Sequence, residues 1–147
     1  MNVILVVNDY PQNLALLTTQ LLLLNYQVAA STIHDDAYEI AHRLRPSLIM
    51  MEFSRVDIDE ASAIRRFKAD ESLGNIPIIV VSTRSTADSK TRAHDAGCDA
   101  YITKPYDATH LKHIIKQFFA TINAQSPARE NLIPPQPTAP SQFSAGT

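Results

Sequence analysis

The feature that most constrains the fold of this chain is an alternation of short apolar runs with helix-like segments, repeated five times. The apolar runs are rich in β-branched residues, and several lack the polar alternation of a strand that faces water on one side. We therefore expect strands that are covered on both faces. The runs occupy residues 3–7, 26–30, 48–51, 76–81 and 100–103.

The segments between these runs carry apolar residues three or four positions apart, which is the spacing of one helical face. The first stripe includes Leu14, Leu17 and Leu21, with Pro11 near its first turn, and the clearest stripe runs from Leu111 to Ile122. Residues 86–96 are polar and small, and Gly97 follows as a candidate helix C-cap. Five β-α repeats predict an α/β fold, a parallel sheet with helices on both faces.

Length and composition favour one domain followed by a tail. The chain has 147 residues, and we expect a domain at residues 1–123. Residues 124–147 are rich in Pro, Ser, Gln, Ala and Thr, so we expect a disordered tail that buries too little apolar surface to fold.

Charge and cysteine content exclude several classes of protein. A net charge of −2 gives no signature of a nucleic-acid partner. The single cysteine, Cys98, excludes an internal disulfide and fits the cytoplasm. The N-terminus does not resemble a signal peptide, and no apolar stretch approaches the roughly 20 residues that span a bilayer. We expect a cytoplasmic protein without a membrane partner.

Polar residues follow four of the five apolar runs. Asn8 and Asp9 follow the first run, Glu52 the third, Ser82 the fourth and Lys104 the fifth. In open α/β sheets the carboxyl ends of parallel strands face one crevice, where ligands bind. Carboxylates, a hydroxyl and a lysine that converge there suit a hard cation and a phosphoryl group.

Four segments carry a resemblance to a known family, at residues 3–13, 46–52, 76–83 and 96–106. In this order and spacing the chain resembles a response regulator receiver domain of bacterial two-component signalling, from residue 2 to about residue 122. The resemblance implies a flavodoxin-like (βα)5 fold of three layers, with strand order 2-1-3-4-5.

The resemblance implies a metal site in which this chain departs from the family. Asp9 matches an acidic residue that helps to hold Mg²⁺, whereas the neighbouring acidic position is Asn8. Glu52 contributes at the same site, and Ser54 would supply a backbone carbonyl. One negative charge is missing, so we expect Mg²⁺ binding to be weak or absent. Without the resemblance, Asn8 and Asp9 read as a capping pair for the next helix.

The phosphoacceptor position departs further, because Glu52 matches the aspartate that the family phosphorylates. Glutamate has the same functional group with about 1.5 Å of added reach. Misplacement by about 1 Å can lower a rate by about 10²-fold, so we expect poor phosphorylation or none. Glu52 then either mimics the phosphorylated state or forms an inactive ion pair with Lys104.

Three further positions match family residues with other roles. Lys104 matches the lysine that binds the phosphoryl group and pairs with the acceptor carboxylate, and it precedes Pro105 across a bond that is commonly cis in the family. Ser82 matches the hydroxyl that signals phosphorylation, and Tyr101 matches the switch aromatic, although an ordinary half-buried strand tyrosine is the alternative.

His110 and His113 are three positions apart on the last predicted helix, the spacing of a possible metal pair. They lack a third ligand nearby in sequence, so we interpret them as part of an exposed polar face.

We expect an atypical receiver that acts as a protein-interaction module and not as an enzyme. The resemblance implies a partner on the face of the fourth helix, fifth strand and fifth helix, with a histidine kinase or phosphotransfer protein as candidates and a homodimer left open. One alternative is a working phosphorelay receiver phosphorylated at Glu52 or another carboxylate. Another is a flavodoxin-like enzyme or nucleotide binder, which three glycines in the whole chain disfavour.

Overall fold

The fold is an alternation of strands and helices in a computed structural model that describes residues 2–9, 14–32, 35–55 and 58–124. Within these residues the elements are β1 (Val3–Asn8), α1 (Leu14–Leu23), β2 (Gln27–Thr32), α2 (Asp35–Leu44), β3 (Leu48–Phe53), α3 (Glu60–Lys68), β4 (Ile78–Ser82), α4 (Ala87–Ala96), β5 (Ala100–Thr103) and α5 (Ala108–Ala124).

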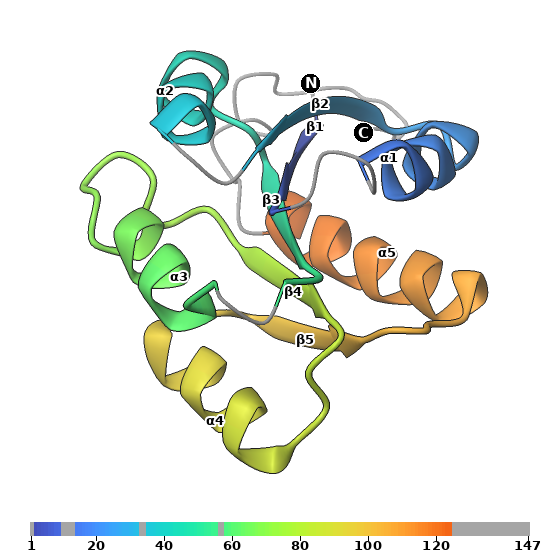
Figure 1. Cartoon of the computed structure of the whole chain (residues 1–147). Coiled ribbons are helices and arrows are strands. Elements are labelled where there is room, and N and C mark those ends of the chain that lie inside the picture. The colour runs from blue at the N-terminus through green and yellow to red at the C-terminus, as the bar shows by residue number, and fades with distance from the viewer. Residues whose placement is uncertain (1, 10–13, 33–34, 56–57, 125–147) are drawn as a thin grey trace. The chain divides into compact units, whose positions relative to one another are not determined.

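The strands form one parallel sheet in the order β2-β1-β3-β4-β5. This confirms the predicted flavodoxin-like strand order. The register places Asn8 beside Glu52 and Phe53 beside Ser82, so the polar strand ends lie at one edge of the sheet. Helix α1 lies on one side of the sheet, and α2, α3 and α4 lie on the other (Figure 1).

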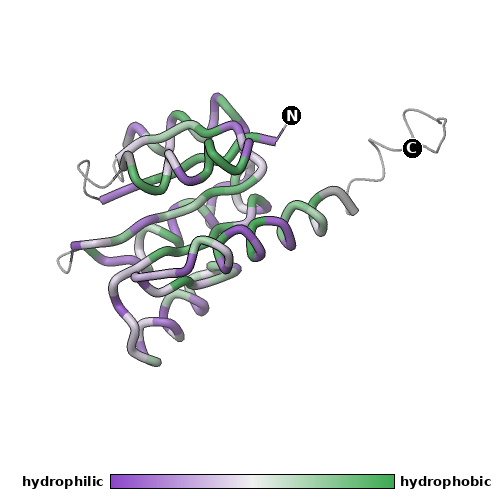
Figure 2. Tube along the Cα trace, turned by 90° about the vertical axis from the view of Figure 1, so that its right-hand side faces the viewer, coloured by the Kyte–Doolittle hydropathy of each residue, from purple (hydrophilic) through white to green (hydrophobic). Residues whose placement is uncertain are grey.

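The core on the side of α2, α3 and α4 is built from every second residue of the central strands, because successive strand side chains point to opposite faces. Full burial of each aliphatic side chain contributes roughly 1.5–3 kcal/mol relative to an exposed one. Figure 2 shows that α4, lowest in both views, is traced mainly in purple and white, as expected for an outer helix. The buried strand residues on this side are Leu5, Val7, Ile49, Met51, Phe53, Ile78 and Val80.

Local signals define the ends of α3 and α4. The Asp59 carboxylate accepts a hydrogen bond from the Ser62 amide, and the Thr86 hydroxyl accepts one from the Ser89 amide, so both helices have an N-cap. Gly97 ends α4 with φ of 114°, which confirms the predicted C-cap. A Cβ at Gly97 would also lie 2.9 Å from Lys68 Cγ, so two constraints favour glycine there.

By its internal contacts the chain divides into two units, Met1–Leu111 and Lys112–Thr147. The first unit contains the sheet, α1 to α4 and all the site residues described below. The second contains most of α5. The predicted tail lies largely outside the described residues, as does Pro11, so the boundary at residue 123 stays a prediction.

Candidate functional site

Glu52 lies at the carboxyl end of β3 and is 2% exposed. One carboxylate oxygen, Oε1, accepts a hydrogen bond of 2.5 Å from Asn8 Nδ2. The other, Oε2, lies 2.5 Å from Lys104 Nζ. The β1–β3 register brings Asn8 to Glu52, and the turn after β5 brings Lys104. Each oxygen of this buried carboxylate therefore has a donor.

Asp9 is buried beside Glu52 but binds backbone amides. Its two oxygens each lie 2.9 Å from the Ser54 amide nitrogen, and Oδ2 lies 2.8 Å from that of Arg55. The Asp9 amide in turn donates to the Glu52 carbonyl at 3.2 Å. Lys104 also donates to Ser54 Oγ at 2.8 Å. Asp9 thus fixes the start of the loop that follows β3.

These residues are a poor fit for Mg²⁺, which requires near-octahedral oxygen coordination. The site offers two carboxylates, and both are engaged by donors from the protein: Asp9 by amides, Glu52 by Asn8 and Lys104. Within the part of the chain that the structure describes, no group of three or more His, Cys, Asp or Glu side chains is arranged to hold a metal ion. His110 and His113 are both exposed on α5.

A cavity of about 400 Å³ adjoins Glu52. Within it Tyr106 donates from its hydroxyl to Gln20 Oε1 at 2.5 Å. Burial and the nearby negative charge of Glu52 raise the pKa of Tyr106 to about 12, so the ring stays a neutral donor. The Lys104–Pro105 peptide bond is cis, as the resemblance implied. The cavity is lined by Leu16, Gln20, Glu52, Thr83, Lys104, Pro105 and Tyr106.

Ser82 is fully buried at the end of β4, and its hydroxyl points to Glu60. Ser82 Oγ donates to Glu60 Oε2 at 2.6 Å and accepts from the Arg84 amide at 3.0 Å. Because Ser82 lies in register with Phe53, it shares the sheet face of α3 and α4. The predicted switch hydroxyl is thus engaged on the α3 side.

Glu60 is the site residue that the sequence analysis missed. It occupies the first turn of α3 and is 5% exposed, yet it gathers three partners from β4, β5 and the loop between β4 and α4. Beyond Ser82, Arg84 NH1 lies 3.3 Å from Oε2, and the Tyr101 hydroxyl lies 3.2 Å from Oε1. An acidic residue in a first helical turn is ordinarily explained by the helix dipole, so its sequence position gave no signal.

Tyr101 is half-buried on β5, and its hydroxyl also lies 3.0 Å from the Arg84 carbonyl oxygen. Burial raises the pKa of Tyr101, and the negative charge of Glu60 raises it further. Ser82 and Tyr101 therefore meet at the same carboxylate. The structure separates the predicted residues into two clusters: Asn8 and Lys104 contact Glu52, whereas Ser82 and Tyr101 contact Glu60, which was not predicted.

The sheet order, the carboxylate at the end of β3 and the lysine after β5 define a receiver-type signalling domain. The chain belongs to the response regulator receiver family: the model of the response regulator receiver domain matches residues 4–116. The family functions in two-component signalling, and its members are generally signalling modules. Among the described residues, no helix is long and apolar enough to cross a bilayer.

Two curated relatives support this assignment. The chain is 27% identical over 108 residues to the DNA-binding dual master transcriptional regulator RpaA of Synechocystis sp., covering 74% of this chain and 45% of that protein. The match thus spans less than half of that relative. This chain is also 25% identical over 115 residues to the polar-differentiation response regulator DivK of Brucella anthropi, and the match covers 78% of this chain and 94% of DivK.

A solved structure of a receiver domain also resembles this chain. The receiver domain of the sensor histidine kinase PA1611 from Pseudomonas aeruginosa superimposes with a TM-score of 0.71 and 27% identity, covering 81% of this chain and 98% of that domain. That domain was crystallised with a magnesium ion in its active-site cleft. The likeness supports the receiver fold of this chain.

Proposed function

We propose that this receiver is an atypical protein-interaction module of two-component or phosphorelay signalling that is not controlled by ordinary aspartate phosphorylation. One observation carries the proposal. The side chain at the acceptor position is Glu52, and its two oxygens are engaged by Asn8 and Lys104 at 2.5 Å each. Lys104 pairs with the carboxylate as the family resemblance implies.

The geometry of phosphoryl transfer supports this proposal. In-line attack requires the nucleophilic oxygen about 3–3.5 Å from phosphorus with its orbital aligned. Glu52 carries its carboxylate farther from the strand than an aspartate would, and both oxygens must leave their present donors before they attack. We therefore expect transfer to be slower than in a receiver with aspartate by about 10²-fold or more.

The position of Ser82 supports inactivity over mimicry of the phosphorylated state. If Glu52 mimicked a phosphorylated side chain, we would expect the Ser82 hydroxyl to form a hydrogen bond with Glu52. Instead, Ser82 donates to Glu60 at 2.6 Å. Glu52 itself is paired with Lys104, which neutralises its charge. The resting conformation is then set by the Glu60 cluster.

Weak Mg²⁺ binding belongs to the same proposal. Asn8 supplies an amide where the family has an acid, and this amide donates to Glu52. The Asp9 oxygens accept three amide hydrogen bonds, which compete with a metal for lone pairs. If Mg²⁺ binds, Asp9, Glu52 and the Ser54 carbonyl are the residues that would hold it.

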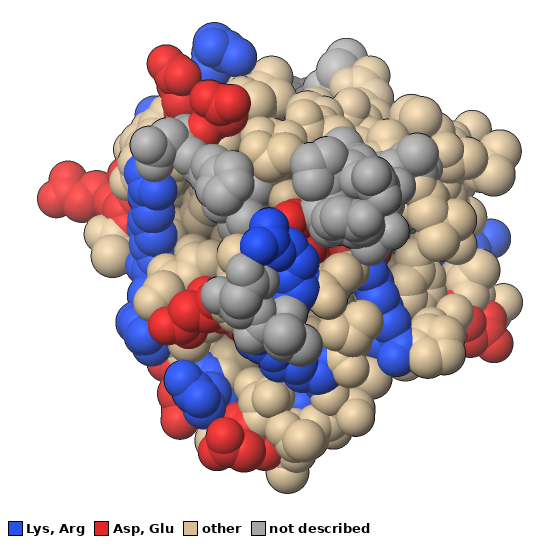
Figure 3. Space-filling model, in the orientation of Figure 1, with Lys and Arg blue, Asp and Glu red and all other residues tan. Residues whose placement is uncertain are grey.

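We expect a protein partner that contacts α4, β5 and α5, with a histidine kinase or phosphotransfer protein as candidates. The face seen in Figure 3 carries both signs of charge, with Lys and Arg beside Asp and Glu over α3 and α4. This mixture favours a protein over a nucleic acid. We further expect a cytoplasmic protein that is not an enzyme; a homodimer remains open.

The test is addition of beryllofluoride, an analogue of the phosphoryl group, with Mg²⁺, followed by amide NMR spectra. We expect no shift of the Ser82 and Tyr101 amides in the wild type. The Glu52→Asp variant, run in parallel, is the matched control because it restores the family's acceptor. Saturable shifts of both amides in the wild type would instead support a working receiver and overturn the proposal.

A further inference from the structure

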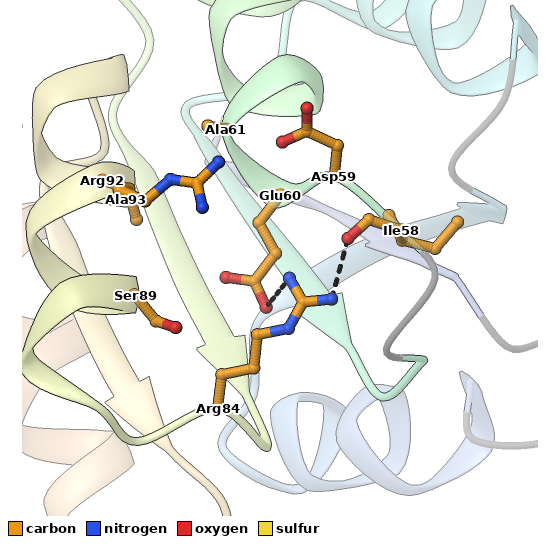
Figure 4. Close-up of a pocket in the computed structure, with 8 residues that line it drawn as sticks. All are labelled: Ile58, Asp59, Glu60, Ala61, Arg84, Ser89, Arg92 and Ala93. Atoms are coloured by element: carbon orange, nitrogen blue, oxygen red, sulfur yellow. Dashed lines mark hydrogen bonds and ion pairs between the residues drawn. The ribbon is translucent and has the colours of Figure 1, made fainter.

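A second cavity lies between α3 and α4, away from Glu52. It has a volume of about 330 Å³, which is at the lower end of the range for small-molecule sites. Its walls combine small apolar side chains with four charged ones. Figure 4 shows Glu60 entering from the first turn of α3, with Asp59 just before that helix, and the two arginines entering from α4 and the loop before it. The lining residues are Ile58, Asp59, Glu60, Ala61, Arg84, Ser89, Arg92 and Ala93.

The two carboxylates of this cavity are engaged by the protein. Asp59 accepts from the amide and hydroxyl of Ser62 at 3.2 and 2.9 Å, and these hydrogen bonds lower its pKa. Glu60 accepts from Ser82 at 2.6 Å and pairs with Arg84. Neither carboxylate offers a free charge to a cationic ligand.

Of the two arginines that line the cavity, Arg84 pairs with Glu60, whereas Arg92 can offer its charge to a ligand. Its guanidinium reaches from α4 over the cavity, towards the carboxylates of α3 (Figure 4). Among the residues that the structure describes, it forms no hydrogen bond or ion pair; Asp59 acts on it only as a charge at longer range. Arginine presents a planar fork of donors that matches carboxylate and phosphate groups. The Ser89 hydroxyl lies on the same helix, one turn away.

We propose that this cavity binds a small organic anion through a carboxylate or phosphate group held by Arg92, with Ser89 as a second donor. The apolar walls at Ala61 and Ala93 would contact the rest of the ligand. Because one charge-assisted contact supplies most of the affinity and Asp59 opposes it, the expected Kd for a minimal anion is on the order of 1 mM. The site does not depend on the proposed function.

Two residues that line the cavity, Glu60 and Arg84, also contact the predicted switch residues Ser82 and Tyr101. Arg84 NH2 donates to the Ile58 carbonyl at 2.9 Å, while NH1 pairs with Glu60 at 3.3 Å (Figure 4). Glu60 in turn holds Ser82 and Tyr101. An anion beside Arg92 would compete with Glu60 for Arg84. A ligand that binds one arrangement of this cluster better than the other shifts the population of the switch.

The experiment is a titration of the full chain with inorganic phosphate and, separately, with malonate, followed by amide NMR. Ionic strength is held constant with chloride, because screening alone shifts charged surfaces. We expect saturable shifts of the Ser89 and Arg92 amides with phosphate, with malonate or with both. The anion that binds more tightly shows whether the site prefers a phosphate or a carboxylate group. Smaller shifts at Ser82 and Tyr101 should follow the same curve.

The Arg92→Gln variant should bind at least about tenfold more weakly, as expected for loss of a charge-assisted contact. Lys90→Gln removes an exposed positive charge from the same helix outside the cavity, and its Kd should stay within about twofold of the wild type. Equal binding by Arg92→Gln, or no saturable shift up to about ten times the expected Kd, would overturn the site. Binding without any shift at Ser82 and Tyr101 would overturn the coupling.

Discussion

Lys104 and Glu52 form a buried ion pair at the carboxyl edge of the sheet, with Nζ and Oε2 2.5 Å apart and side chains 18% and 2% exposed. Asn8 completes the environment of the carboxylate from β1. The charge of Glu52 is thus neutralised within the protein. A second carboxylate, that of Glu60, accepts hydrogen bonds from Ser82 and Tyr101 and is separate from this pair.

Replacing Asn8 by aspartate should change both stability and metal binding. The variant places a second carboxylate against Glu52 Oε1, where the amide now donates at 2.5 Å. Like charges at this distance and the lost hydrogen bond should lower the free energy of unfolding by about 2–3 kcal/mol without Mg²⁺. Mg²⁺ should recover part of this loss, because a ligand of the native state stabilises it.

Urea unfolding with and without Mg²⁺ measures both effects. Asn75→Asp adds the same charge at an exposed turn and should change neither. Stabilisation of the wild type by Mg²⁺ to the same extent as Asn8→Asp would contradict the weak metal site.

Replacing Glu60 by glutamine should weaken its contacts with Ser82, Arg84 and Tyr101. The variant removes the ion pair with Arg84 and weakens the hydrogen bond from Ser82, so we expect the free energy of unfolding to fall by about 1–2 kcal/mol. The negative charge of Glu60 raises the pKa of Tyr101, so that pKa should fall, although burial keeps it above the ordinary value of 10.0.

NMR titration of the Tyr101 ring and urea unfolding give the two readouts. Glu39→Gln, on the exposed side of α2, is the charge-matched control and should leave both unchanged. An unchanged Tyr101 titration in Glu60→Gln would mean that the two side chains are not coupled in solution.

Asp70 should contribute to the loss of stability in acid. The Tyr38 hydroxyl donates to its carboxylate, and the amides of Ser72 and Leu73 donate at 2.8 and 3.0 Å. The hydrogen bond from Tyr38, followed by those amides, lowers the pKa of Asp70 below 3.8. A carboxyl with a depressed folded-state pKa stabilises the fold fully above its unfolded pKa, near pH 4, and loses that contribution as pH falls further.

Thermal unfolding between pH 7 and pH 2 measures this effect. Asp70→Asn should be less stable at neutral pH and should lose less stability than the wild type below about pH 4. Asp36→Asn, at an exposed position on α2, should follow the wild-type curve. Parallel curves for Asp70→Asn and the wild type would show that Asp70 does not contribute to the acid transition.

The sequence predicted the sheet well because buried parallel strands are continuous apolar runs. The limits of β2 and β4 were less well predicted. β2 extends to Thr32 because Ser31 and Thr32 pair with Val7 and Asn8, and such backbone pairing is blind to side-chain polarity. β4 begins at Ile78, two residues after the predicted start, because Pro77 has no amide to donate.

The sequence placed the residues around Glu52 at one edge of the sheet, since strand ends in a parallel sheet meet there, and the structure brings Asn8 and Lys104 to it. It did not predict the partner of Ser82. Glu60 lies 22 residues away and reaches Ser82 only through the packing of α3 on the sheet. Side-chain direction at a long separation is not encoded in spacing or composition.

The central claim is that Glu52, at the proposed acceptor position, is sufficient to prevent ordinary phosphorylation even when Mg²⁺ is supplied in excess of what its weak site requires. The most direct test is incubation with acetyl phosphate and Mg²⁺ followed by intact-mass spectrometry, with the wild type beside Glu52→Asp. We predict a gain of one phosphoryl group, about 80 Da, in Glu52→Asp and none in the wild type. The same gain in the wild type would contradict the claim and identify a working phosphorelay receiver.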